Sequence, residues 1–135
     1  MNTSLKTIAQ NCLRAAEDNS QAFPQIVETL MNAGFEGYNI DFRRAVSIYY
    51  CPGGETIEFS LNKAMGEIEA TFNASAIQAA VREAQEQAPG YSYAGFCTKL
   101  TQAGCAGYVV SFLGRRVLYF GRTAETHVEH FPGRN

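Results

Sequence analysis

The sequence predicts an α+β protein made of two tandem helix-helix-strand-strand-strand repeats related by a pseudo-twofold axis. Two observations carry this prediction. The stretch AGFEGYNIDF, residues 33–42, recurs seventy residues later as AGCAGYVVSF, residues 103–112. In each half, the spacing of apolar residues then changes from the three or four of a helix to the two of a strand. We expect an antiparallel sheet or sheets with helices packed on one face.

The repeat extends well beyond those ten residues. Residues 23–51 align without a gap on residues 93–121, and seven of the 29 positions are identical, where average composition gives roughly two. The identical pairs are Leu30/Leu100, Ala33/Ala103, Gly34/Gly104, Gly37/Gly107, Tyr38/Tyr108, Phe42/Phe112 and Tyr49/Tyr119. We therefore expect a single domain, residues 1–135, made of internal repeats at about 1–66 and 70–135.

The first half begins with two predicted helices. Thr3 or Ser4 can cap the first, Pro24 suits the first turn of the second, and Gly34 can close the second in the left-handed conformation. Strands are expected at residues 38–42, 46–50 and 57–61, with Cys51-Pro52-Gly53-Gly54 as a turn. The inward residues are expected to be Tyr38, Ile40 and Phe42 on the first strand and Val46, Ile48 and Tyr50 on the second, which places Ser47 and Tyr49 outward.

The segment of residues 62–73 should pack against the protein because it carries Met65, Ile68 and Phe72. The second half then repeats the pattern. A third helix is capped by Asn73 or Ser75 and ends at Pro89-Gly90; a fourth begins at Ser92 and is closed by Gly104.

Strands are expected at residues 108–112 and 116–120, followed by a last strand within residues 125–131. Its register has two solutions. Matching Thr126 to Thr56 points His127, Glu129 and Phe131 inward, whereas a shift of one residue points Val128 and His130 inward. We expect a bulge or an irregular end there.

Composition excludes several classes of function. A net charge of -2 and a pI near 5.7 argue against a general nucleic-acid binder, which would carry a basic stripe. No apolar run approaches the ~20 residues that cross a bilayer, and the first residues lack the apolar core of a signal peptide, so no membrane association and a cytoplasmic location are expected.

No residue pattern in the sequence indicates catalysis, a cofactor or a metal. The two histidines lie in HVEH, residues 127–130, where a strand would separate them onto opposite faces. The cysteines, Cys12, Cys51, Cys97 and Cys105, form no C-x-x-C pair and are interpreted as reduced and structural. A nucleophile at Cys97 is disfavoured by its place on an apolar helix stripe. Gly34-x-x-Gly37 and Gly104-x-x-Gly107 follow helices, unlike phosphate loops, and are interpreted as turn formers.

Two surfaces remain as candidate sites. Arg43-Arg44 and Arg115-Arg116 lie at equivalent hairpin tips and could contact an anion. An outer sheet face is expected to carry Tyr49, Tyr119, Val109 and Val117. This face could meet a protein partner, a second copy of the chain or a ligand, or it could be an internal layer between the halves.

The motifs FPQIVETLMNAGFEGYNIDF with YYCPGGET, and YAGFCTKLTQAGCAGYVVSF with YFGRTAETHVEHFPG, resemble the two halves of the YdfO-like family. These are small uncharacterised bacterial and prophage proteins, often labelled "phage envelope protein". Tyr108 stands where many members have tryptophan, and Gly121-Arg122 where many have an acidic turn. The resemblance implies an α+β fold and a bacterial or prophage setting, and it implies no catalytic residue.

The leading hypothesis is a non-enzymatic binding or interaction module with an unknown protein partner or self-association. The alternative is a small-molecule binder or enzyme with its site in the crevice between the repeats. A flat apolar patch would favour the first, and a deep enclosed pocket lined by both repeats would favour the second.

Overall fold

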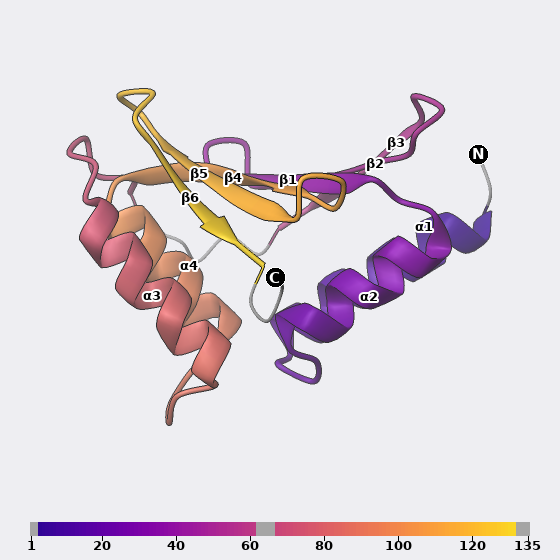
Figure 1. Cartoon of the computed structure of the whole chain (residues 1–135), viewed down its shortest axis with the longest axis horizontal. Coiled ribbons are helices and arrows are strands. Elements are labelled where there is room, and N and C mark those ends of the chain that lie inside the picture. Colours follow the sequence, from indigo (N-terminus) through magenta and orange to yellow (C-terminus); the bar gives the residue numbers. More distant parts are fainter. Residues whose placement is uncertain (1–2, 62–66, 132–135) are drawn as a thin grey trace.

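The structure is a computed structural model that describes residues 3–61 and 67–131. Two expectations, a cap from the side chain of Thr3 or Ser4 and the packing of Met65, lie outside the described part. The elements follow the expected order, with two helices and three strands in each half (Figure 1). The helices are α1 Thr3–Glu17, α2 Phe23–Ala33, α3 Ala74–Glu86 and α4 Tyr93–Gln102. The strands are β1 Gly37–Asp41, β2 Val46–Tyr50, β3 Thr56–Ser60, β4 Cys105–Ser111, β5 Arg116–Gly121 and β6 Thr126–His130.

The helix ends carry the signals expected from the sequence. Pro24 lies in the first turn of α2, and the side chains of Asn73 and Ser92 cap α3 and α4 by accepting bonds from backbone N–H groups at 3.0 Å. Gly34 caps the end of α2 at φ +102, and Gly104 follows α4 at φ +85. Both glycines therefore adopt the left-handed conformation that the repeat predicted.

The six strands form one antiparallel sheet in the order β3-β2-β1-β4-β5-β6, so the two three-stranded halves join through β1 and β4. All four helices lie on the same side of this sheet, as a pair from each repeat (Figure 1). The core fills the space between the sheet and the helices, with Leu30, Ile40, Ile77, Leu100 and Val110 fully buried.

The pairing of β1 with β4 contains the pseudo-twofold axis. Asn39 pairs with Val109, the residue that holds the same position in the second repeat. The other pairs are related in the same way: Tyr38 pairs with Val110, and their repeat equivalents, Tyr108 and Ile40, pair with each other. Hydrogen bonds outside the ladder obey the same symmetry: Phe42 N–H donates to the Ala106 carbonyl at 3.0 Å, and Phe112 N–H donates to the Glu36 carbonyl at 3.1 Å.

Two glycines make this junction possible. A Cβ at Gly37 would meet the Val110 carbonyl oxygen at 2.4 Å, and a Cβ at Gly107 would meet the Ile40 carbonyl oxygen at 2.4 Å. The interpretation of all four repeat glycines as turn formers is therefore wrong for this pair, since both are strand residues. They allow two backbones to approach closely where the repeats meet.

The structure corrects the expected face of β2 and β5. Ser47 and Tyr49 pair with Ile40 and Tyr38 and are buried beneath the helices, whereas Ile48 faces outward with Asn39. The four-residue loop between Asp41 and Val46 makes these two residues partners, which fixes the faces of every later residue in β2. The aliphatic pattern of β2 suggested the opposite face because its outer side is also half-buried.

The strands of the second repeat show the same alternation of faces: Val117 and Tyr119 face the helices, and Val109 faces outward. The last strand follows the register set by Thr126, with His127 opposite Tyr119 and Glu129 opposite Val117. The expected bulge or irregular end is wrong over Thr126–His130, because β5 and β6 pair there without a break. The register shift lies instead at the start of β4, between Cys105 and Gly107.

Candidate ligand cavity between the repeats

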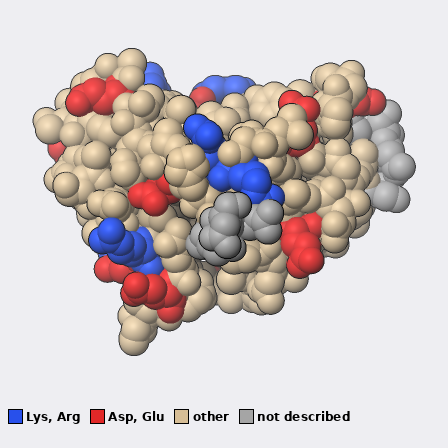
Figure 2. Space-filling view, viewed as in Figure 1, with Lys and Arg blue, Asp and Glu red and all other residues tan. Residues whose placement is uncertain are grey.

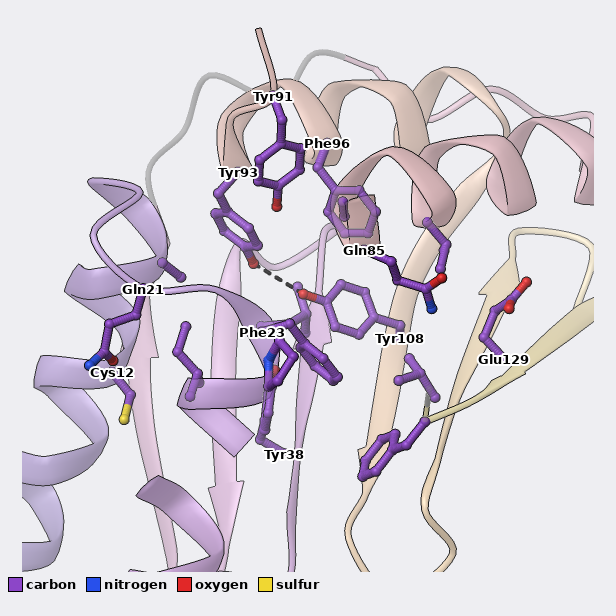
Figure 3. A pocket seen from close by; sticks show the side chains of 18 of the residues that line it. Cys12, Gln21, Phe23, Tyr38, Gln85, Tyr91, Tyr93, Phe96, Tyr108 and Glu129 are labelled. Atoms are coloured by element: carbon purple, nitrogen blue, oxygen red, sulfur yellow. Dashed lines mark hydrogen bonds between the residues drawn. The ribbon is translucent and has the colours of Figure 1, made fainter. Parts of the chain in front are cut away.

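A cavity of about 180 Å³ lies between the two helix pairs and the inner face of the sheet. Its walls come from both halves of the chain: α1 and α2 on one side, α3, α4 and the loop between them on the other, and the inner face of the sheet. Figure 3 shows labelled side chains from these separate elements around one space. The volume lies below the roughly 300–1,000 Å³ of pockets for drug-sized ligands, so it fits a small molecule or one group of a larger one.

Tyrosine dominates the lining. Six of the seven tyrosines in the chain contribute: Tyr38, Tyr49, Tyr91, Tyr93, Tyr108 and Tyr119. Two pairs are related by the repeat, and each pair packs ring to ring, at 5.3 Å between Tyr38 and Tyr49 and 5.4 Å between Tyr108 and Tyr119. The sheet thus presents four aromatic rings to the helices in a pseudo-symmetric arrangement.

The two repeats differ at the start of α4. Tyr93 occupies the position that Phe23 holds in the first repeat, and its hydroxyl lies 3.2 Å from the hydroxyl of Tyr108 (Figure 3). The backbone N–H of Tyr93 donates to the Asn19 side chain at 2.8 Å, which connects the start of α4 to the loop after α1. Among the described residues, no hydrogen bond joins the hydroxyl of Tyr38 or Tyr119 to the protein. These hydroxyls are available to a ligand or to water.

Burial keeps the cavity tyrosines in their neutral form. It raises the pKa values of Tyr38, Tyr93 and Tyr108 well above the usual value near 10. Burial also raises the pKa of Tyr49 to about 12, and the negative charge of Glu17 contributes in the same direction. These side chains therefore act as neutral hydrogen-bonding groups across the physiological pH range.

One carboxylate borders this aromatic space. Glu129 lines the cavity from β6 (Figure 3), and its Oε2 lies 2.6 Å from Nε2 of His127. Both side chains are about one-fifth exposed. The equivalent positions in β3, seventy residues earlier, hold Ile57 and Phe59, so a polar pair replaces an apolar pair on the same face of the sheet.

The cysteines are unpaired, and Cys12, Cys97 and Cys105 are buried while Cys51 is half-buried. Burial raises the pKa of Cys97 to about 12 and that of Cys105 to about 11. A thiolate, the reactive form, is therefore disfavoured at neutral pH. Within residues 3–61 and 67–131 no group of three or more His, Cys, Asp or Glu side chains is arranged to hold a metal ion.

The arginine tips do not meet. Because β1 and β4 are antiparallel, the hairpin with Arg43 and Arg44 and the hairpin with Arg115 lie at opposite ends of the sheet. Arg44 pairs with Glu58 at 3.3 Å, and the guanidinium of Arg115 lies over the ring of Phe131 at 5.6 Å from its centroid. Arg116 begins β5, and its Nε donates to the Gly114 carbonyl. Positive and negative side chains are interspersed on the face shown in Figure 2.

The expected outer-face cluster is divided between two places. Tyr49, Val117 and Tyr119 line the cavity, whereas Val109 lies on the opposite face of the sheet. Sequence reasoning did not find the contributions of Tyr91, Tyr93 and the ends of α1 and α3. The one available signal was the repeated pair Tyr38/Tyr108 beside Tyr49/Tyr119.

Comparison with known proteins gives a family but no activity. The family model described as "Protein of unknown function (DUF1398)" matches residues 10–129, which include every strand of the sheet except the last residue of β6. No curated protein matches the chain. No helix in the part of the chain that the structure describes is long and apolar enough to span a membrane.

Proposed function

The chain belongs to the DUF1398 family of proteins of unknown function, and from its cavity we propose that it binds a small molecule between its two repeats. The single observation that carries this proposal is the tyrosine-lined cavity to which both repeats contribute. A folded chain usually fills such a space with side chains, because empty apolar volume costs stability. The unpartnered hydroxyls of Tyr38 and Tyr119 add polar groups that a ligand could satisfy.

A matched pair of variants on one helix tests this proposal. Ala84 of α3 lines the cavity, whereas Ala79 of α3 is exposed and does not. Ala84→Phe fills the space, and Ala79→Phe has the same intrinsic effect on the helix. A library of small metabolites is screened by thermal shift and by tyrosine fluorescence, which reports on the cavity because the chain has no tryptophan.

Compounds that stabilise the parent and Ala79→Phe but not Ala84→Phe are the expected result. A library without any stabilising compound, or compounds that stabilise Ala84→Phe as strongly as the parent, would contradict the proposal. We retain in this proposal the bacterial or prophage setting that the resemblance to YdfO-like proteins implies, and the cytoplasmic location that the sequence analysis expects.

A second candidate function, self-association, has its own observation. Within residues 3–61 and 67–131, no helix lies on the outer face of the sheet (Figure 1). The central row of this face contains Ile48, Val109, Leu118 and Val128, interrupted by Asn39. An apolar row on an uncovered sheet face is typical of a protein interface. Light scattering tests this: a dimeric parent that becomes monomeric in the double variant Val109→Ser, Leu118→Ser is expected, and a monomeric parent would refute it.

A further inference from the structure

We propose that the ligand of the cavity is a small organic cation, an alkylammonium group held by tyrosine rings with Glu129 as its counter-charge. This inference rests on the proposed function and names its ligand class. Three observations support it: the charge of the lining, the aromatic character of the lining, and the position of the one carboxylate.

The lining favours positive over negative charge. Among the described residues around the cavity there is no lysine or arginine, and Glu129 is the only acidic one. The nearby Arg115 lies in the neighbouring groove, where its charge is already placed over Phe131. His130, which is exposed, is the one histidine of the lining. An anionic ligand would therefore find no permanently positive side chain in a largely apolar site, which is unfavourable.

The aromatic rings offer direct attraction to a cation. The face of an aromatic ring carries partial negative charge, so a cation within about 6 Å of the ring is stabilised, and more so when water is excluded. The stacked pair Tyr38/Tyr49, the tilted pair Tyr108/Tyr119 and the adjacent Tyr93 concentrate such rings in one small space. Their hydroxyl oxygens can also accept hydrogen bonds from those ammonium groups that carry an N–H.

The carboxylate is placed where the fold does not need one. The first repeat forms the equivalent strand with Ile57 and Phe59, and its edge packs normally, with Phe59 at 5.9 Å from Tyr49. In the second repeat the same face carries His127 and Glu129. Placing a carboxylate there loses hydration. Glu129 contacts His127, whose ring lies 6.4 Å from the ring of Tyr119. A cationic ligand gives this charge a function.

The test compares two probes of equal shape. Choline carries a quaternary ammonium, and 3,3-dimethylbutan-1-ol replaces its nitrogen by carbon and has no charge. Binding of each is measured by calorimetry and tyrosine fluorescence to the parent, to Glu129→Gln and to Glu58→Gln. Glu58 is a matched control because it lies on β3, on the outer face, and its substitution changes net charge equally.

Choline should bind the parent roughly tenfold more tightly than the alcohol. Glu129→Gln should reduce choline affinity several-fold and leave the alcohol unchanged, while Glu58→Gln should behave as the parent. Equal binding of the two probes, tighter binding of the alcohol, or no binding of choline overturns the cation assignment. The proposed function has a separate test. It is contradicted when no compound of the library stabilises Ala79→Phe more than Ala84→Phe.

Discussion

Replacing the two equivalent glycines Gly34 and Gly104 with alanine should have unequal effects, although the sequence presents them as one repeated signal. Both have positive φ, at +102 and +85. A Cβ at Gly34 meets no atom within 4 Å. A Cβ at Gly104 would lie 2.1 Å from the carbonyl oxygen of Thr71 and 3.0 Å from Cα of Phe72.

The magnitude follows from these two environments. At Gly34 only the conformational penalty of a side chain at positive φ applies, about 1 kcal/mol. At Gly104 the same penalty is joined by overpacking, typically 1–3 kcal/mol, so a total loss of about 2–4 kcal/mol is expected. The segment it meets cannot move freely, because Asn73 N–H donates to the Ala103 carbonyl at 2.8 Å.

Urea unfolding at equilibrium measures both losses, provided that the slopes of the transitions agree among the parent and the two variants. Gly34→Ala serves as the matched control for the conformational term. Equal destabilisation by the two variants would refute the reasoning, since it would mean that residues 71–73 do not pack against the end of α4 as described.

Three further predictions follow from the fold. Gly37→Ala should destabilise the protein by about 2 kcal/mol or more in urea, because its Cβ would meet the Val110 carbonyl oxygen at the repeat junction; an unchanged midpoint would contradict the close approach. Cys51 should react first with a thiol reagent at pH 8 and Cys97 slowest, because burial raises the pKa of Cys97 to about 12; mass spectrometry that finds Cys97 labelled first would contradict this. The folded-state pKa of Tyr49 is raised to about 12, above the unfolded value near 10, so its contribution to stability is complete below pH 10 and is lost as pH rises toward 12; a free energy of unfolding that is constant from pH 9 to pH 12 would oppose this.

The order of helices and strands was predictable because the sequence contains the same pattern twice, so each half supports the interpretation of the other. Pro24, Ser92 and the two left-handed glycines act through local backbone geometry, which a sequence displays directly. The faces of β2 and β5 were not predictable from their aliphatic residues. They depend on the number of residues in the preceding loop, and a change of one residue there moves Tyr49 and Tyr119 to the other face of the sheet.

The cavity could be predicted only in part. The sequence drew attention to Tyr49, Val117 and Tyr119, but assigned them to the wrong face of the sheet. It could not bring Tyr93 to Tyr108, because their meeting depends on the packing of α4 over β4. Nor could it separate the two arginine hairpins, whose positions follow from the antiparallel pairing of β1 with β4.

The pseudo-twofold axis, which passes between Asn39 and Val109, bears on how the cavity could evolve. In a dimer of two identical single repeats joined by the same strand pairing, each cavity residue would occur once on either side of the axis. A mutation would then change both sides of the cavity together. Fusion into one chain removes that restriction. Tyr93 stands where the first repeat has Phe23, and Glu129 where it has Phe59, and two identical chains could not hold these differences. The joined chain can therefore distinguish the two ends of a molecule lying across its own axis.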